Sequence, residues 1–225
     1  MSSMKTVLAI GAHPDDIEIG CGGAELLLKK MDCSLVHVIA TNGEEGDINS
    51  NPAELKLIRQ NEARTSANVM GADQVHFLNL PDGATSFGKD EKIALMEIIR
   101  RVKPHIVFTH AFSDHFPDHA MVHQLTMAAI EGAKGPWFPL AGESPHKVDV
   151  VLGYEVWHPM SRYQKAVDIS SVIEDKIHAL NQHRSQTSGV DYLDAVRALA
   201  RFRGVMAMAG QYAEVFEVLR ADGPL

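Results

Sequence analysis

Short apolar runs alternate with longer segments of mixed polarity along most of this chain. The apolar runs are rich in β-branched residues and predict buried strands over residues 7–10, 35–41, 75–80 and 106–109. The segments between and after them carry apolar residues at helical spacing and predict helices over residues 20–30, 52–69, 90–102 and 118–133. Strands that alternate with helices are typical of a parallel sheet with right-handed crossover connections.

The last third of the chain is less regular. A Pro/Gly-rich loop over residues 135–146 is followed by predicted strands over 148–157, 166–169 and 214–219, and by predicted helices over 172–185 and 192–203. No stretch has the composition of a linker, so residues 1–225 are expected to form one domain. The predicted fold class is α/β: a single-domain, Rossmann-like, mostly parallel sheet with helices on both faces and a C-terminal extension.

Composition narrows the function classes. The chain has 225 residues, 45% hydrophobic and 22% charged, which is enough for one α/β core. The net charge is −8 and no run of Lys or Arg exceeds two residues, so no nucleic-acid partner is expected. No apolar run approaches the roughly 20 residues that span a bilayer, so no membrane association is expected either. Cys21 and Cys33 are too few for a disulfide framework and favour a reducing, cytoplasmic location.

Candidate chemistry begins where the first predicted strand ends. The stretch AIGAHPDDIEIGCGG places His13, Asp15 and Asp16 within four positions. An imidazole and a carboxylate in one rigid turn can bind a divalent cation, and the second carboxylate could face a water on that cation. A turn followed by a helix N-cap is the alternative, and it accounts for the aspartates. It does not account for a histidine at the end of the strand, so the sequence favours a metal site.

The second half of such a site is expected after the fourth predicted strand. Five histidines fall within 19 residues there, at positions 105, 110, 115, 119 and 123. Ligands of open α/β sheets bind at the carboxyl ends of the strands where the strand order reverses, commonly between the first strand and the fourth. His13 and Asp16 are therefore expected to face residues beyond Thr109. From spacing alone, either His119 or His123 could complete a His-Asp-His zinc site with an open position for water.

These motifs resemble those of a known family. The run A-H-P-D-D-x-E followed by G-G resembles the LmbE-like (PIG-L) zinc-dependent N-acetylglucosaminyl deacetylases, which include enzymes of the mycothiol and bacillithiol pathways. Further similar motifs follow in the same order: TNGEEG, R-x-x-E at Arg59 and Glu62, DHFPDH, and K-x-x-A-L-x-x-H-x-S-Q from Lys176 to Gln186. From spacing alone, Arg59 and Glu62 would instead form a pair on the surface of a helix.

The resemblance implies a metal-dependent mechanism. His13, Asp16 and His119 would bind one Zn²⁺ per chain, with another divalent metal such as Fe²⁺ as the alternative. Asp15 would be the general base toward the attacking water, whose pKa zinc lowers to about 7. The substrate would be an N-acetylated amino sugar or its conjugate, from which acetate is removed. Because relatives often assemble, a homo-oligomer is also expected.

One position departs from the family pattern. The family's second motif is D-x-H-P-D-H, and its first histidine is assigned to oxyanion stabilisation or acid catalysis. That position is Phe116 in this chain, and a phenyl ring neither donates such a hydrogen bond nor carries a proton. His115 is the expected substitute, with His110 and His146 as alternatives. Asp118 of the same motif is also expected to be catalytic.

Substrate contacts are expected from loops far apart in the sequence. Trp137, Phe138 and Trp157 could stack on a sugar face. Arg59 could hold an anionic group of the substrate, and His146 is also predicted to bind the substrate. Two other functions stay open: a zinc amidase acting on another amide, such as a thiol conjugate, and a metal- or sugar-binding protein with weakened catalysis.

Overall fold

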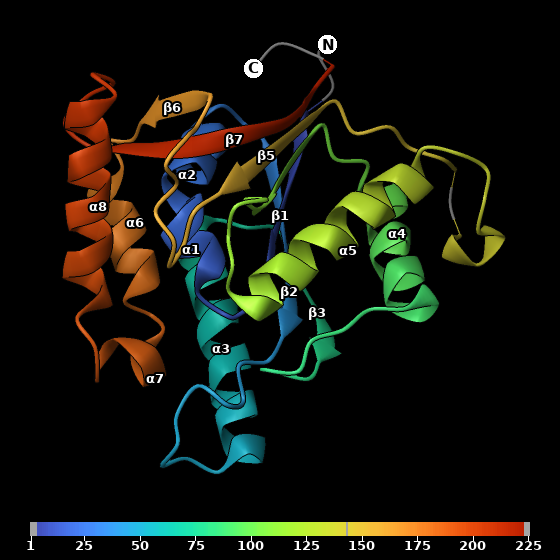
Figure 1. Cartoon of the computed structure of the whole chain (residues 1–225), viewed down its shortest axis with the longest axis horizontal. Coiled ribbons are helices and arrows are strands. Elements are labelled where there is room, and N and C mark those ends of the chain that lie inside the picture. Colours follow the sequence, from blue (N-terminus) through green and yellow to red (C-terminus); the bar gives the residue numbers. More distant parts are fainter. Residues whose placement is uncertain (1–3, 143, 223–225) are drawn as a thin grey trace.

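Within residues 4–142 and 144–222, which this computed structural model describes, seven strands form one sheet in the order β3-β2-β1-β4-β5-β7-β6 (Figure 1). The strands are β1 (Thr6–Gly11), β2 (Ser34–Thr41), β3 (Gln74–Leu80), β4 (Ile106–His110), β5 (Val150–Tyr154), β6 (Lys165–Asp168) and β7 (Ala213–Ala221). Strands β1 to β5 run parallel, whereas β7 is antiparallel to β5 and β6 is antiparallel to β7. The predicted α/β class with a mostly parallel sheet is confirmed.

Helices cover both faces of this sheet. They are α1 (Asp16–Gly20), α2 (Gly22–Lys30), α3 (Pro52–Met70), α4 (Lys89–Val102), α5 (Pro117–Ala133), α6 (Ile173–Leu180), α7 (Arg184–Thr187) and α8 (Tyr192–Met206), with a 3₁₀ turn η1 (Pro139–Ala141). Figure 1 shows α4 and α5 on one side of the sheet, and α1, α2, α3, α6 and α8 on the other. The C-terminal extension consists of α6, α7, α8 and the two antiparallel strands.

Alternate residues of β1 enter two different hydrophobic clusters. Val7 and Ala9 belong to the cluster on the side of α1, α2 and α6. Leu8 and Ile10 belong to the cluster on the side of α4 and α5. Because successive side chains of a strand point to opposite faces, a strand covered on both faces is apolar at every position. This is the physical reason that the run at residues 7–10 is apolar throughout.

The bounds of two predicted helices and one predicted strand differ from those in the structure. The helix predicted over residues 20–30 is α2, which begins at Gly22; a separate short helix, α1, precedes it and was not predicted, and the backbone at Cys21 between them leaves the helical conformation (φ −138°, ψ 7°). Gly20 packs against Tyr154 at this break, where a Cβ atom would lie 2.1 Å from the Tyr154 ring. The helix predicted over residues 172–185 is divided into α6 and α7. The strand predicted over 148–157 is shortened to β5.

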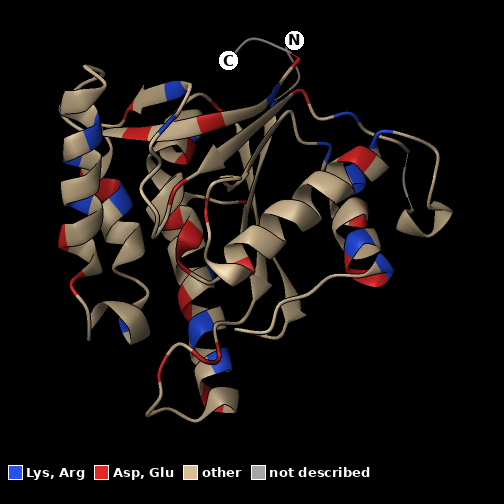
Figure 2. Ribbon diagram, in the orientation of Figure 1, with Lys and Arg blue, Asp and Glu red and all other residues tan. Residues whose placement is uncertain are grey.

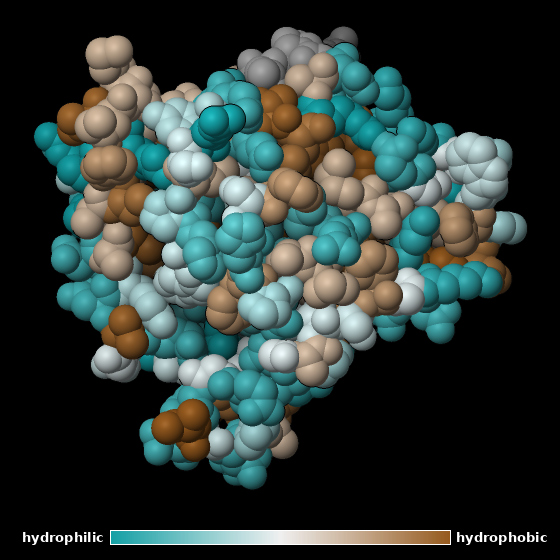
Figure 3. All heavy atoms as spheres, viewed as in Figure 1, coloured by the Kyte–Doolittle hydropathy of each residue, from teal (hydrophilic) through white to brown (hydrophobic). Residues whose placement is uncertain are grey.

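Positively charged side chains are dispersed over the part of the chain that the structure describes. Figure 2 shows Lys and Arg spread over several helices and strands. None of the described helices combines the length and the apolar character that a bilayer crossing requires. Hydrophobic residues reach the surface along the edge where α8 lies (Figure 3), and the exposed Phe202 and Val205 belong to this helix. The cytoplasmic location and the homo-oligomer stay predictions from the sequence.

Candidate active site

The carboxyl ends of β1 and β4 lie side by side at one edge of the sheet. Strand β1 pairs in parallel with both β2 and β4. The order runs outward through β2 to β3 on one side and through β4 to β5 on the other, so it reverses between β1 and β4, as predicted. The turn after β1 and the loop after β4 therefore meet at a crevice of the kind in which open α/β sheets bind ligands.

Three side chains with metal-ligand chemistry converge in this crevice. His13 Nδ1 lies 3.4 Å from Asp16 Oδ2, and His119 Nε2 lies 3.3 Å from His13 Nδ1. The ligand atoms of the three residues all lie within 4.8 Å of one another. Asp16 Oδ1 is buried and has no hydrogen-bond partner among the described residues. Because buried polar atoms are nearly always paired, this donor set fits a cation between the three groups.

Asp114 determines which nitrogen of His119 faces the crevice. His119 Nδ1 lies 2.8 Å from Asp114 Oδ2, which leaves Nε2 toward the crevice. A carboxylate behind a ligating histidine is a common orienting partner. His123, one turn further along α5, instead donates from Nδ1 to the carbonyl oxygen of His110 at 2.8 Å. Of the two histidines that spacing left open, His119 is the one turned to the crevice.

The ring of His110 stacks on the ring of His119 and is uncharged. The two rings are stacked with their centroids 4.0 Å apart. His110 Nε2 accepts a hydrogen bond from the Ala12 N–H at 3.0 Å. Burial, and after it the neighbouring His119, lowers the pKa of His110 to about 4. His110 is therefore uncharged at neutral pH and adds no repulsion next to a cation.

Two carboxylates contact His13 on the side away from Asp16. His13 Nε2 lies 3.1 Å from Asp82 Oδ1 and 3.3 Å from Asp118 Oδ2. Asp118 also accepts hydrogen bonds from the Gly83 and Thr85 N–H groups at 2.8 and 3.2 Å. Burial alone would raise the pKa of Asp118, but its hydrogen bonds, the one from His13 foremost, hold it well below its usual range. Asp118 thus stays ionised and orients His13.

Asp15 lies beside the three converging residues and faces Arg59. Asp15 Oδ1 lies 3.4 Å from Arg59 Nη2, and both side chains are buried. Burial raises the pKa of the Asp15 carboxyl above its usual range, and Arg59 offsets this effect only in part. Arg59 Nη1 also donates to the Gly43 carbonyl oxygen at 3.0 Å. The prediction that Arg59 and Glu62 form a surface pair is wrong. Arg59 faces Asp15, and Glu62 accepts two hydrogen bonds from Ser185.

A cavity of about 410 Å³ opens over these groups. Its lining joins segments from both halves of the chain: His13, Asp15, Glu45, Gly46, Arg59, Asp82, Gly83, Phe116, Asp118, Trp157, Gln186 and Tyr192. The C-terminal extension contributes an aromatic pair, Trp157 and Tyr192, whose ring centroids lie 4.9 Å apart. The cavity thus offers both ionised groups and aromatic surface to a ligand.

Comparison with known proteins agrees with this geometry. The family described as GlcNAc-PI de-N-acetylase (PIG-L) matches residues 8–130, more than half of the chain. The chain belongs to the PIG-L family. The family prediction made from the A-H-P-D-D motif is therefore confirmed, and the family is one of de-N-acetylases.

The PIG-L relatives include deacetylases and a hydratase. The chain is 31% identical over 195 residues to the diacetylchitobiose deacetylase of Thermococcus kodakarensis, covering 82% of this chain and 71% of the relative. It superposes on the N,N'-diacetylchitobiose deacetylase from Pyrococcus horikoshii with a TM-score of 0.85 and 27% identity, over 96% of this chain and 84% of that one. The 4-carboxy-2-hydroxymuconate hydratase from Pseudomonas putida gives a TM-score of 0.86 and 26% identity, over 99% and 100%. Proteins with this fold therefore catalyse two different reactions, so the reaction of this chain has to be inferred from the residues of its site.

Phe116, the residue at which the resemblance leads one to expect a histidine, packs against two of the three converging residues. Its ring stands edge-on to that of His13 with centroids 5.7 Å apart, and its centroid lies 4.8 Å from that of His119. Phe116 also lines the cavity. Phe116 therefore gives the cavity an apolar surface next to His13 and His119 and supplies no proton donor there.

Three of the predicted site residues lie away from the cavity. His115 is exposed, and its ring lies 6.0 Å from that of His158, outside the cavity lining. Trp137 and His146 follow α5, whose 17 residues extend about 25 Å from the crevice. His146 Nε2 accordingly donates to the Pro104 carbonyl oxygen at 2.7 Å, on the side where β4 begins. The predicted substrate contacts of Trp137 and His146 are corrected, because α5 carries their loop to the opposite edge of the sheet.

Sequence reasoning missed Asp82, Gln186 and Tyr192. Asp82 comes shortly after β3 ends, and a carboxylate at the carboxyl end of a parallel strand was the available signal. Gln186 ends the K-x-x-A-L-x-x-H-x-S-Q motif, which the resemblance noted without a role. Tyr192 begins α8, and nothing in its local sequence separates it from an ordinary helix start.

Proposed function

We propose that this chain is a metal-dependent hydrolase that removes the acetyl group from an N-acetylated amino sugar or its conjugate. The observation that carries the proposal is the buried Asp16 oxygen, without a partner in the described chain and flanked by nitrogens of His13 and His119. The buried carboxyl of Asp15 lies alongside. The diacetylchitobiose deacetylases among the relatives support an N-acetylated sugar as the substrate class.

His13, Asp16 and His119 are the proposed ligands of one zinc ion, with Fe²⁺ as the alternative. Two imidazoles and one carboxylate with an open position form a known catalytic zinc set. When bound, such a cation lowers the pKa of a water and polarises a carbonyl oxygen. Asp114 and Asp118 hold the two imidazole rings in the orientation that this set requires.

Asp15 is the proposed proton carrier. The oxygen of the attacking water bonds to the acetamide carbon while its proton passes to Asp15. The same carboxyl returns this proton to the nitrogen as the C–N bond breaks, which releases acetic acid and the amine; the acid then gives up its remaining proton, and the amine is protonated at neutral pH. A raised pKa suits a carboxyl that takes and returns a proton near neutral pH. Arg59, at 3.4 Å, holds this carboxyl in place.

The assignment of both proton transfers to Asp15 replaces the role predicted for His115. His115 is exposed and does not line the cavity, and the His146 side chain is engaged by the Pro104 carbonyl oxygen on the side where β4 begins. His110 is fully buried against His119 and, with a pKa of about 4, is uncharged at neutral pH, so it does not act as the acid for the leaving nitrogen. Asp118 is ionised and serves His13. Asp82 also lines the cavity. Burial opposes ionisation of Asp82, but its contact with His13 holds its pKa below the usual range, so Asp15, whose pKa burial raises, is the carboxyl better suited to carry a proton.

The sugar hydroxyls are assigned to polar side chains of the cavity. Glu45, Asp82 and Gln186 line it and offer acceptors, and Gln186 also offers donors. Arg59 is 3% exposed and contacts Asp15. Its proposed role is to hold the Asp15 carboxyl in place, and this role replaces the predicted contact with an anionic group of the substrate. Trp157 keeps its predicted role as a stacking surface.

Acetate release from N-acetylglucosamine and N,N'-diacetylchitobiose tests the proposal. Zinc-loaded protein should release one acetate for each amine formed, a chelator should abolish the reaction, and added zinc should restore it. A zinc amidase for another amide would bind zinc and leave both sugars intact. A sugar-binding protein would bind the sugars without releasing acetate. Either of these results would refute the proposed reaction.

Hydration of an unsaturated acid is a second candidate function. The likeness to the hydratase extends over that protein's whole length. Phe116 favours this candidate, because adding water across a double bond expels no amine and so needs no acid for a leaving nitrogen. Consumption of 4-carboxy-2-hydroxymuconate, followed by its ultraviolet absorbance, together with no acetate from either sugar, would select hydration over deacetylation.

A further inference from the structure

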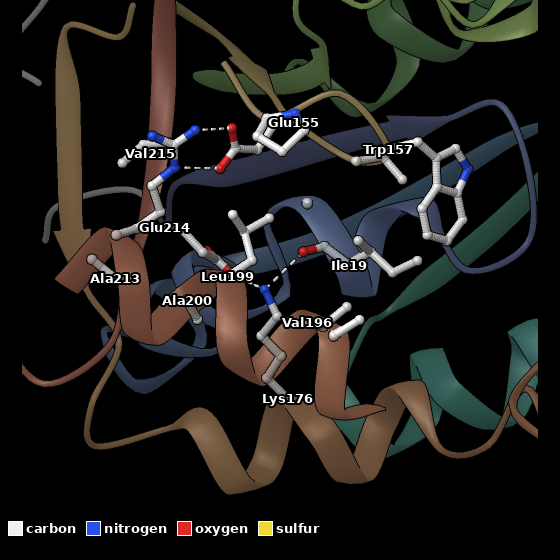
Figure 4. A pocket seen from close by; sticks show the side chains of 15 residues that line it. Ile19, Glu155, Trp157, Lys176, Val196, Leu199, Ala200, Ala213, Glu214 and Val215 are labelled. Atoms are coloured by element: carbon white, nitrogen blue, oxygen red, sulfur yellow. Dashed lines mark hydrogen bonds and ion pairs between the residues drawn. The ribbon is translucent and has the colours of Figure 1, made fainter. Parts of the chain in front are cut away.

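The loop after β5, residues 155–160, is closed by a buried ion pair. Arg203, on α8, donates to both carboxylate oxygens of Glu155, at 2.8 and 2.6 Å, and to the Met160 carbonyl oxygen at 2.8 Å. The Met160 N–H also donates to Glu155, at 2.5 Å. Figure 4 shows Glu155 and Trp157 on this loop, and the dashed lines that end on Glu155 mark the hydrogen bonds from Arg203. Because one planar guanidinium binds both ends, the loop is held in a single shape.

This closed loop carries two neighbouring side chains to two parts of the candidate active site. Trp157 lines the cavity over the ligand residues. His158 lies against the carboxylate of Asp114 instead, with 3.1 Å between His158 Nδ1 and Asp114 Oδ1. The loops after β4 and β5 can meet in this way because the two strands are parallel neighbours, so their carboxyl ends lie at one edge of the sheet.

Asp114 contacts His119 with one carboxylate oxygen and is held by the other. Its Oδ2 lies 2.8 Å from His119 Nδ1. Its Oδ1 accepts a hydrogen bond from the Phe116 N–H at 3.0 Å in addition to the contact with His158. Without His158, the Phe116 N–H would be the remaining donor to Oδ1 within the described residues. One donor fixes the rotation of a carboxylate less well than two, and rotation would move Oδ2 away from His119.

We infer that His158 is a positioning residue of the metal site, which fixes the Asp114 carboxylate and through it the ring of His119. This inference rests on the proposed binding of zinc by His119. None of the motifs that carry the family resemblance includes His158. Its side chain is 48% exposed, but the closed loop holds it in place, so little freedom is lost when it contacts Asp114.

The affinity for zinc, measured by competition with a chelator, tests this role. Removing the partner directly behind a ligating histidine weakens metal binding roughly 10–100-fold, and His158 lies one contact further out, so His158→Ala should weaken it about tenfold. His158→Asn places an amide N–H near the position of Nδ1 and should retain most of the affinity. His115→Ala is the matched control, because His115 is an exposed histidine beside His158 whose side chain makes no hydrogen bond to Asp114 in the described structure. It should bind zinc as the wild type does.

A double-mutant cycle separates an effect through Asp114 from a general effect on the fold. Asp114→Ala should weaken zinc binding more than His158→Ala does, and the double variant should bind zinc no more weakly than Asp114→Ala alone. A further tenfold loss in the double variant would show that His158 acts independently of Asp114 and would overturn the inference. An affinity of His158→Ala equal to that of the wild type would overturn it as well.

The same affinities distinguish this inference from the proposed reaction. If neither sugar releases acetate but His158→Ala binds zinc about tenfold more weakly than the wild type, the deacetylase proposal fails and the role of His158 stands. If acetate is released and His158→Ala binds zinc as tightly as the wild type, the role of His158 alone is overturned. If the wild-type protein binds no zinc, both are overturned.

Discussion

Replacing Asp15 by Asn is the most direct perturbation of the proposed chemistry. Asparagine keeps the shape of the side chain and an oxygen toward Arg59, but it cannot take the proton of the attacking water. Asp15 is not among the three converging ligand residues, so zinc should be retained. General acid–base catalysis contributes roughly 10²–10⁴ in rate, and both proton transfers are assigned to Asp15. We therefore expect kcat to fall by roughly 10³–10⁴, which corresponds to about 4–5.5 kcal/mol of barrier.

The same substitution should leave the fold stable. Burial disfavours the ionised Asp15 carboxyl more than Arg59 favours it, which is why its pKa is raised in the folded state. A carboxyl with a raised folded pKa makes its stabilising contribution at low pH and loses it as the pH rises through that pKa. The uncharged Asn removes this cost at neutral pH. Arg59 loses its ion-pair partner at the same time, which opposes this gain, so we expect the fold to be retained with a Tm close to that of the wild type.

Three measurements decide the outcome for Asp15→Asn: acetate release at fixed zinc occupancy, zinc content by elemental analysis, and Tm by circular dichroism. Asp90→Asn, at an exposed position in the first turn of α4, controls for the loss of one carboxylate. A kcat within tenfold of the wild type would refute the role of proton carrier. Loss of zinc together with activity would make Asp15 a ligand instead.

Three further substitutions test the surroundings of the ligand residues. His119→Ala should lose the metal in elemental analysis while His123→Ala retains it, and the reverse result would contradict the ligand assignment. Asp118→Asn should weaken zinc affinity about 10–100-fold in chelator competition, with kcat restored by excess zinc, and an unchanged affinity would remove its orienting role. Burial opposes ionisation of Glu18, but His183 and further partners outweigh burial and lower the pKa of Glu18 from 4.5 to about 2. The ionised Glu18 therefore stabilises the fold by an amount on the order of 3 kcal/mol. This contribution is present above pH 4.5 and is lost as the pH falls toward 2. In urea unfolding, the deficit of Glu18→Gln against the wild type should shrink over that pH range, and a constant deficit would contradict this account.

The buried parallel strands were the part of the fold that the hydrophobic pattern predicted best. The run at residues 7–10 is apolar at every position because its side chains enter two clusters, one on each face of the sheet. Helix boundaries were predicted less well. The break between α1 and α2 accompanies the packing of Gly20 against Tyr154, a residue far along the chain, so no local pattern announces it.

The tertiary structure alone decided several contacts of the candidate site. Helical spacing predicts that Arg59 lies on a helix, but the packing of α3 against α2, α6 and α7 leaves that side chain buried and facing Asp15. Asp82 joins the site because β3 ends at the same edge of the sheet. Trp137 and His146 leave it because α5, a rigid helix, carries their loop to the opposite edge.

The sequence by itself determined the local half of this site. His13, Asp15 and Asp16 share one turn after a buried strand, so the geometry of a few bonds brings them together without any long-range contact. The choice of His119 among five histidines depended on where α5 begins and on the carboxylate of Asp114 behind it. Neighbours in the chain are held together by covalent geometry, whereas groups about 100 positions apart meet only where the packing of the sheet brings their strands side by side.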